Sequence, residues 1–545
     1  MDGSMALSQP HNEPALTYRP GSPETAALNS ELSRMRGEHL ELTQTVGGVQ
    51  RLGGGESIDV IEPHDHHRVL GTLRNASGDD VGRAIAAALF AAPAWRDLSY
   101  ADRASVILRA ADLIAGPWRA TLNAATMLGQ SKSVQQAEID AACELIDFLR
   151  FNARFGERLL SEELTSPNGT WNRFDHRPLE GFVLAITPFN FTSIAANLPT
   201  APALMGNVVV WKPSPTQQLA AHYTMRVLEA AGLPPGVVNL VTGDGLAVSE
   251  VAVPHRDLAG IHFTGSTKTF QHLWQTVGAN IDGYRSYPRI VGETGGKDFI
   301  IVHPSVHGLL PELRTALLRG AFEYQGQKCS AASRAYVPRS VWAKLRDDLA
   351  SATEELPYGD VTDFGNFGGA VIDRRAFDKA QAVIARLTAD PRCRIVAGGR
   401  VDDSVGFFVR PTIVECDDPN HEAFTTEYFA PILAVHVFDD SEYDAVVAQA
   451  SEVAPYALTG AVWARDRTVI ARSLAALRYA AGNIYVNDKP TGAVVGQQPF
   501  GGARASGTND KAGSVFNLMR WISPRVIKET FVPPADHRYP HMDPR

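Results

Sequence analysis

The amino-acid sequence predicts an α/β fold with two open parallel sheets, each in a domain of its own. Three observations predict it: helical spacing dominates residues 80–155, short β-branched runs alternate with helical stretches from residue 182, and a second such series begins at residue 299. Strands separated by helical segments need right-handed crossovers, which produce parallel sheets covered by helices on both faces. The crevice between two such domains is the expected ligand site.

The N-terminal half is expected to begin with an arm and a helical layer. Ser22 and Pro23 predict the capped start of a helix over 26–35, and helices follow over 80–155. The polar, turn-rich stretch 164–179 predicts a protruding hairpin. A lone hairpin is marginally stable, so we expect it to pair within a homo-oligomer, a dimer or larger.

The strands of the two sheets are expected where β-branched residues cluster. The first sheet should contain strands at 182–186, 208–211, 237–241, 261–264 and 289–291. The second should contain strands at 299–302, 335–337, 413–414, 432–437, 460–463 and 483–486.

The composition is that of a globular protein acting on a small molecule. The chain has 545 residues, of which 44% are hydrophobic and 20% are charged, with a net charge of −9. An acidic chain lacks the basic footprint of a nucleic-acid-binding protein, and no apolar run is long enough to span a membrane. Because the first 20 residues resemble neither a secretory signal nor a transit peptide, we expect a cytoplasmic location.

Neither the cysteines nor the histidine cluster predicts a metal site. Cys143, Cys329, Cys393 and Cys416 are spaced by 186, 64 and 23 positions, which fits neither a zinc motif nor a disulfide framework. His64, His66 and His67 lie between two apolar runs, so a solvated hairpin turn is the expected structure. We therefore expect no metal and a reducing compartment.

Three polar residues at loops or strand ends suggest a catalytic centre. Cys329 lies in a loop between a helix and a strand, and Glu293 and Asn190 end two predicted strands. A thiolate is a good nucleophile, a buried carboxylate can act as a general base, and an amide can stabilise an oxyanion. A single cysteine is more often a small buried side chain, so only the combination is informative.

Six motifs together resemble the successive signatures of the aldehyde dehydrogenase superfamily over about residues 58–523. They are TPFNF at 187–191, WKPS at 211–214, FTGST at 263–267, ETGGK at 293–297, GQKC at 326–329 and EYFAP at 427–431. The resemblance implies that Cys329 is the nucleophile, Glu293 the general base and Asn190 an oxyanion donor together with the backbone N–H of Cys329.

The same resemblance implies NAD as the cofactor. Its binding residues would be Thr187, Lys212, Ser214, Gly265, Ser266, Thr267, Glu427 and Phe429. Gly265 and Ser266 open a predicted helix, whose N-terminal N–H groups suit a pyrophosphate. Two positions depart from the family pattern, because Phe270 replaces a glycine of the phosphate loop and Pro215 replaces a frequent carboxylate. The preference for NAD over NADP therefore depends on a closer resemblance.

That closer resemblance lies in residues 485–511, which are similar to the corresponding segment of the Δ1-pyrroline-5-carboxylate dehydrogenases. It implies that L-glutamate γ-semialdehyde is oxidised to glutamate with NAD, the second step of proline degradation. The substrate-binding residues would be Ser330, Gly492, Ala493, Phe191, Phe500, Glu144 and Lys328. Glu144 could equally be a carboxylate on a helix face.

Two alternatives remain open: a dehydrogenase for another semialdehyde, and a non-catalytic binding protein of the same fold. The resemblance divides the chain into an NAD-binding part with the arm and helical layer (1–156 and 178–296), a catalytic domain (297–522) and oligomerisation elements (157–177 and 523–545).

Overall fold

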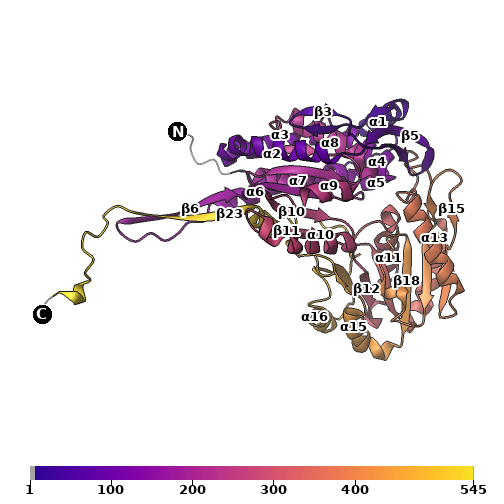
Figure 1. Cartoon of the computed structure of the whole chain (residues 1–545). Helices are drawn as coiled ribbons and strands as arrows, with labels where there is room; N and C mark the ends of the chain where they lie inside the picture. The colour runs from indigo at the N-terminus through magenta and orange to yellow at the C-terminus, as the bar shows by residue number, and fades with distance from the viewer. Residues whose placement is uncertain (1–6, 544–545) are drawn as a thin grey trace.

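The computed structural model describes residues 7–543, so the outermost ends of two predicted segments, 1–6 and 544–545, lie outside the described residues. Two seven-stranded sheets, each between helices, lie beside one another, and a thin two-stranded arm projects from them (Figure 1). The α/β class with two open sheets is confirmed. Within residues 7–543, no helix combines the length and the apolar character needed to cross a bilayer.

The first sheet has the strand order β11-β10-β7-β8-β9-β2-β3. Its five parallel strands are those predicted: β7 (Phe182–Thr187), β8 (Val208–Pro213), β9 (Val238–Leu240), β10 (Leu258–Thr264) and β11 (Arg289–Glu293). The antiparallel edge formed by β2 (Gln44–Val46) and β3 (Val49–Arg51) was not predicted. All six residues of β7 are buried, because both faces of the sheet are covered.

Helices cover this sheet on both sides. On one face, α2 (Gly78–Asp97), α9 (Gly245–Ala252) and α10 (Thr267–Ala279) pack against Phe182, Leu184 and Ile186. On the other, α7 (Thr192–Leu204) and α8 (Gln218–Ala230) pack against Val183 and Ala185. The predicted helical layer over 80–155 is divided by the structure: α2 covers the opposite face of the sheet. The rest of the layer lies outside α7 and α8 and consists of α3 (Tyr100–Ala115), α4 (Arg119–Gln130), α5 (Val134–Ala137) and α6 (Leu145–Leu160).

The second sheet has the order β14-β17-β18-β13-β12-β20-β21. The predicted strands are β12 (Asp298–Val302), β13 (Ala332–Pro338), β17 (Thr412–Cys416), β18 (Ile432–Phe438), β20 (Thr459–Trp463) and β21 (Asn483–Val486), all parallel. The unpredicted β14 (Cys393–Ala397) pairs antiparallel with β17. Helices α11 (Leu310–Phe322) and α12 (Arg339–Glu355) cover one face, and α13 (Arg374–Ala389), α15 (Tyr443–Glu452) and α16 (Arg467–Ala476) cover the other.

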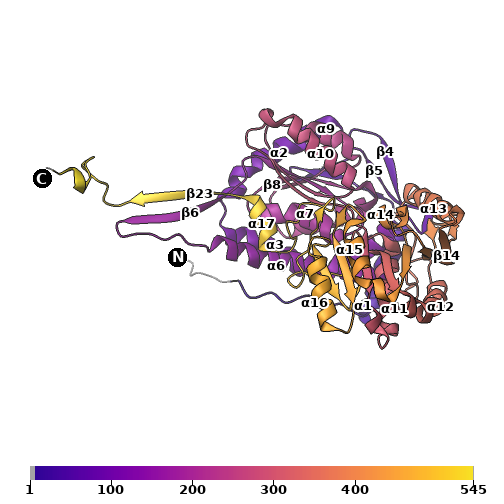
Figure 2. The ribbon, with the colours of Figure 1, turned by 90° about the horizontal axis from the view of Figure 1, so that it is seen from below.

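The predicted protruding hairpin is wrong in its pairing. Strand β6 (Thr170–Pro178) has no partner within the stretch 164–179 and pairs antiparallel with β23 (Ile522–Thr530) from the end of the chain. Figures 1 and 2 show the two strands side by side from both directions, extending away from the sheets. Proximity in sequence favours a local hairpin, but nine consecutive register pairs with β23 satisfy the backbone groups along one edge of β6.

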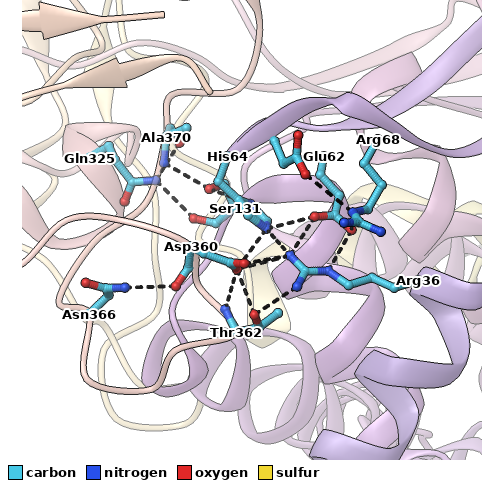
Figure 3. Close-up of polar contacts among 11 residues, drawn as sticks. Arg36, Glu62, His64, Arg68, Ser131, Gln325, Asp360, Thr362, Asn366 and Ala370 are labelled. Atoms are coloured by element: carbon cyan, nitrogen blue, oxygen red, sulfur yellow. Dashed lines mark hydrogen bonds and ion pairs between the residues drawn. The ribbon is translucent and has the colours of Figure 1, made fainter. Parts of the chain in front are cut away.

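The N-terminal segment forms helix α1 (Pro23–Gly37), capped by Ser22 as predicted, and a small sheet of β1 (Leu40–Glu41), β4 (Ser57–Glu62) and β5 (Asp65–Arg74). The histidine cluster lies at the β4–β5 turn as expected, and His67 is exposed there, but His64 is only 2% exposed, so the turn is solvated only in part. Its Nε2 lies 3.2 Å from a carboxylate oxygen of Glu62, and its Nδ1 lies 3.1 Å from Ser131 Oγ (Figure 3).

Candidate active site

The loop that presents Cys329 begins with an unusual turn. Tyr324, Gln325 and Gly326 all have positive φ angles, 49°, 53° and 65°, and the first two lack the freedom of glycine. The Gln325 side-chain amide holds the turn by donating to the carbonyls of Ser131 (3.0 Å) and Ala370 (2.6 Å), as Figure 3 shows. A Cβ at Gly326 would lie 2.4 Å from the Ala430 carbonyl oxygen, so the close approach requires glycine.

Asn190 and the cysteine loop are joined directly. Asn190 lies between the end of β7 and the start of α7, is 4% exposed, and donates from Nδ2 to the carbonyl of Gln327 at 3.0 Å. Gln327 is fixed in turn, because its side-chain oxygen accepts the backbone N–H of Ile372 at 2.9 Å. One Nδ2 hydrogen of Asn190 therefore stays available beside the loop that ends at Cys329.

Cys329 and Glu293 line neighbouring cavities and influence each other electrostatically. Burial raises the pKa of the Cys329 thiol well above its usual value, and the carboxylates of Glu293 and Asp298 raise it further. Burial also raises the pKa of Glu293 to about 8, and its enclosed Oε1 has no hydrogen-bond partner within residues 7–543. Near pH 7 the Cys329 thiol is therefore protonated, and Glu293 is mostly protonated with a minor ionised fraction.

A cavity of about 50 Å³ lies on the Glu293 side of the site. Glu144, Phe500 and Lys511 are among its lining residues, together with apolar side chains such as Phe148 and Ile194. Cys329 lines a second, smaller space with Lys328, Glu427 and Phe429. The structure thus groups the candidates of the two sheets at one edge, where β11 and the loop before β13 meet.

The sequence left open that Glu144 is a carboxylate on an ordinary helix face, and the structure does not place it on one. It ends a π-helical segment, Glu138–Glu144, inserted between α5 and α6, and π-helical turns often occur at functional sites. Burial, and then the carboxylate of Asp140, raises the pKa of Glu144 to about 8. Its side chain faces the cavity that Phe500 also lines.

Sequence reasoning missed two charged residues beside the site. Lys132 and Asp140 are fully buried and form an ion pair at 2.7 Å, and the Lys132 ammonium lies 4.0 Å from the centre of the Phe191 ring. Asp140 also accepts the backbone N–H groups of Thr192 and Ser193, at the start of α7. The only sequence signal is the polar break at 130–133 between two helical stretches, because charged residues are rarely buried completely.

The remaining candidates for the substrate end surround the cysteine loop. Ser330 Oγ and Thr491 Oγ1 are 2.7 Å apart, both buried, and Lys328 pairs with Glu323 at 2.9 Å. Gly492 has a φ of 94° and is exposed, and Ala493 is half-buried. The backbone groups of this turn are therefore accessible to a ligand.

The candidate cofactor residues gather at the ends of β7, β8 and β10. Thr187 accepts the indole N–H of Trp211 at 3.0 Å, and its carbonyl accepts the N–H of Ser214 at 3.1 Å. Lys212 is buried, and desolvation lowers its pKa to about 8. Gly265 and Ser266 precede α10, which Ser266 caps by accepting the N–H of Thr269, while Thr267 begins the helix.

Glu427 and Phe429 approach from the other sheet. A Glu427 carboxylate oxygen accepts the N–H of Gly296 at 2.9 Å, and a Cβ at Gly295 would lie 2.5 Å from that carboxylate. Phe429 has a φ of 58° and its ring meets Phe189 edge-on at 5.8 Å. Phe189 precedes Asn190, so residues of both sheets converge here.

Comparison with known proteins identifies the family. The profile of the aldehyde dehydrogenase family matches residues 51–527, most of the chain. The chain belongs to the aldehyde dehydrogenase family. This aldehyde dehydrogenase is 47% identical over 532 residues to the mitochondrial Δ1-pyrroline-5-carboxylate dehydrogenase of Bos taurus, covering 97% of this chain and 94% of the bovine one.

Two further proteins resemble this aldehyde dehydrogenase over nearly its whole length. A probable Δ1-pyrroline-5-carboxylate dehydrogenase of Schizosaccharomyces pombe is 46% identical, covering 97% of each chain. A crystal structure of the Δ-pyrroline-5-carboxylate dehydrogenase from Mycobacterium tuberculosis bound with NAD is 58% identical, has a TM-score of 0.96 and covers 100% of both chains.

The structure explains how this aldehyde dehydrogenase accommodates Phe270 in place of a family glycine. Phe270 is 9% exposed and stacks on Phe263 with ring centres 5.5 Å apart. Its ring lies over Gly292, where an added Cβ would come within 2.2 Å of it. The large Phe270 ring therefore fits because Gly292 has no side chain in the space that the ring occupies.

Proposed function

We propose that this aldehyde dehydrogenase oxidises L-glutamate γ-semialdehyde, formed by hydration and opening of Δ1-pyrroline-5-carboxylate, to L-glutamate with NAD, a step of proline degradation. The observation that supports it most is similarity over at least 97% of the chain to proteins named Δ1-pyrroline-5-carboxylate dehydrogenase. The grouping of Cys329, Asn190 and Glu293 supports the chemistry independently of those names.

The candidate cofactor residues fit NAD. The buried Lys212 ammonium donates no hydrogen bond to any residue within 7–543, so it is a charged donor that a ribose hydroxyl can satisfy. The start of α10 at Gly265, Ser266 and Thr267 suits the pyrophosphate. Glu427 and Phe429 would hold the nicotinamide ribose and ring, with Thr187 and Ser214 beside the adenosine half. When bound, NAD supplies the hydride acceptor.

Acylation would proceed from a neutral Cys329. The thiol gives its proton to solvent, and its sulfur adds to the aldehyde carbon while the C=O π electrons move onto oxygen, which leaves a hemithioacetal oxyanion. The free Nδ2–H of Asn190 and the backbone N–H of Cys329 donate to that oxyanion, and each such donor contributes ~2.7–4 kcal/mol to transition-state stabilisation. Loss of hydride from the same carbon leaves a thioester on Cys329.

Glu293 would then serve the hydrolysis of the thioester. Its ionised carboxylate takes a proton from water, whose oxygen attacks the thioester carbon and releases glutamate and the Cys329 thiol. A carboxyl group with a pKa of about 8 is a stronger base than an ordinary glutamate and is ionised in part near neutral pH.

The substrate has an α-carboxylate and an ammonium beyond the reacting carbon. We assign the carboxylate to the hydroxyl of Ser330 and the backbone groups of Gly492 and Ala493, since hydroxyls and N–H groups are its natural donors. Phe191 and Phe500 would flank the aliphatic chain. Glu144 and Lys328 would complete the polar boundary of this pocket.

Steady-state NADH formation tests the proposal. Pyrroline-5-carboxylate should give a higher kcat/KM than succinate semialdehyde or an uncharged aldehyde, and NAD a higher one than NADP. A higher kcat/KM for succinate semialdehyde would favour the alternative of another semialdehyde substrate.

A non-catalytic protein of the same fold is the other alternative. Cys329→Ala should abolish NADH formation and leave NAD binding intact by fluorescence titration, whereas Cys143→Ala should keep activity as a matched control. Activity near the wild-type level in Cys329→Ala would contradict the mechanism.

The organisation of the chain forms the last part of the proposal. We propose that residues 1–156 and 178–296 bind NAD, that 297–522 provide the nucleophile, and that 157–177 and 523–545 mediate a homo-oligomer. A cytoplasmic location stays an expectation, and the bovine relative is named mitochondrial.

A further inference from the structure

We propose that Cys393, Cys416 and His421 form a binding site for a thiophilic divalent cation of the Zn²⁺ type, at the outer edge of the second sheet. Their ligand atoms all lie within 4.8 Å of one another. None of the three residues lines the cavities at Cys329 and Glu293. The sequence spacing does not reveal the cluster, because the two cysteines stand 23 positions apart, which matches no zinc motif.

Strand pairing brings the two sulfur atoms together. Cys393 on β14 is the direct partner of Cys416 on β17, and the neighbouring Asp417 N–H donates to the Arg392 carbonyl at 3.0 Å. The cysteine pair therefore occupies a non-hydrogen-bonded position of the antiparallel ladder, where facing side chains approach most closely. Their Sγ atoms are 3.1 Å apart.

His421 completes the cluster from the residue before helix α14 (Glu422–Thr425). Its Nδ1 lies 3.9 Å from Cys393 Sγ and accepts the N–H of Ala423 at 3.1 Å, so Nδ1 is unprotonated. Its Nε2 donates to an Asp390 carboxylate oxygen at 3.1 Å. A histidine whose second nitrogen donates to a carboxylate is the common arrangement behind a metal ligand.

The charges nearby favour a cation. Cysteine binds a metal ion as the thiolate, so a divalent cation would displace the thiol protons of Cys393 and Cys416 to solvent. Asp390 and Asp418 add negative charge, which Arg392 offsets in part through contacts of 2.7 and 3.0 Å.

The geometry needs only a small adjustment. A tetrahedral ion ~2.3 Å from each sulfur separates the two by roughly 3.8 Å, so the pair would open by less than ~1 Å. Cys393 is half-buried on an edge strand and can move outward, whereas Cys416 is 1% exposed. His421 Nδ1 would exchange the Ala423 N–H for the metal, and water would take the fourth position.

Cobalt titration tests the site. The full chain with Cys329→Ser, which removes the proposed nucleophilic thiol, is reduced, stripped of metal and titrated with Co²⁺. We expect thiolate-to-cobalt charge-transfer absorption and the visible bands of tetrahedral Co²⁺, both abolished by excess Zn²⁺. Adding Cys393→Ser or His421→Asn should remove one bound Co²⁺ per chain, while Cys143→Ser should not.

Each control separates binding from folding. His421→Asn keeps a side-chain oxygen for the Ala423 N–H, and both test variants should match the parent in metal-free thermal unfolding. Unchanged Co²⁺ bands in Cys393→Ser would overturn the proposal. So would a chain that takes up no Co²⁺ but forms a Cys393–Cys416 disulfide with peroxide, because the pair would then be a redox pair.

Discussion

The side-chain amide of Asn190 donates to the carbonyl of Gln327, two residues before Cys329, at 3.0 Å. This bond fixes the amide from the first sheet against the nucleophile loop of the second. Because Nδ2 has two hydrogens, one is held by Gln327 and the other can face the oxyanion. Residues from the two sheets therefore contribute to one candidate catalytic group.

Asn190→Ala should lower kcat by ~10²–10³ through loss of one oxyanion donor. NAD binding should stay unchanged in a fluorescence titration, because the amide contacts the loop and not the candidate cofactor residues. Asn190→Asp is the matched variant, since a carboxylate of the same shape cannot donate and should be as slow. A fall in kcat of less than ~10-fold in both would contradict the assignment.

The pKa of Glu293, about 8, predicts the pH dependence of turnover. Below that pH the carboxyl is protonated and cannot accept a proton from water, so kcat should fall as pH decreases through about 8 and reach a plateau above it. Glu293→Gln should give a rapid burst of one NADH per site followed by slow turnover, measured by stopped flow. No burst in this variant would place Glu293 before the thioester instead.

Ser330 should affect substrate choice more than chemistry. Ser330→Ala removes a hydrogen bond to a charged group, ~1.5–3 kcal/mol, so kcat/KM for pyrroline-5-carboxylate should fall by about 10–100-fold. An uncharged aliphatic aldehyde should be oxidised at nearly the wild-type rate. Equal losses for both substrates would mean that the Ser330–Thr491 contact positions Cys329 and does not bind the carboxylate.

Sequence patterns predicted the parallel strands of both sheets and missed the antiparallel strands at one edge of each. Strand β7 is buried on both faces, so it appears as an uninterrupted apolar run. Edge strand β14 has mixed burial and no such pattern. The sequence pattern could not predict the partner of β6 either, because β23 lies far along the chain and the residues near β6 do not indicate a distant partner.

The sequence motifs predicted which residues form the candidate site, but not how these residues are arranged in space. Cys329, Glu293 and Asn190 stand in recognisable motifs, whereas Lys132 and Asp140 are buried charges that only tertiary contacts explain. The left-handed turn at Tyr324 and Gln325 is also invisible in sequence, because neither residue type favours positive φ.

The Arg36–Glu62 contact should contribute strongly to stability. Glu62 is fully buried and receives two hydrogen bonds from Arg36, at 2.9 and 2.7 Å. Arg36 also donates to Asp360 and Thr362 in the loop between α12 and α13 (Figure 3). Arg36→Met leaves the Glu62 charge without its main partner, so the free energy of unfolding should fall by ~3–5 kcal/mol.

Arg68 offers the matched control in urea denaturation. It is 43% exposed on its side chain and lies 3.7 Å from Glu62, so Arg68→Met should cost less than ~1 kcal/mol. Similar losses for Arg36→Met and Arg68→Met would mean that the buried contact is not the cause.

The arm formed by β6 and β23 should mediate assembly of the proposed homo-oligomer. The register places Trp171 and Val526 on opposite faces of the arm, 49% and 59% exposed, and Phe531, 61% exposed, follows β23, so both faces carry apolar side chains that a second subunit can cover. Val526→Asp should shift the chain toward monomer in light scattering at micromolar concentration, because it would bury a charge in the interface.

Val49→Asp is the control for this prediction, since Val49 is 54% exposed on β3, away from the arm (Figure 1). A wild-type monomer, or equal behaviour of the two variants, would contradict a role of the arm in assembly.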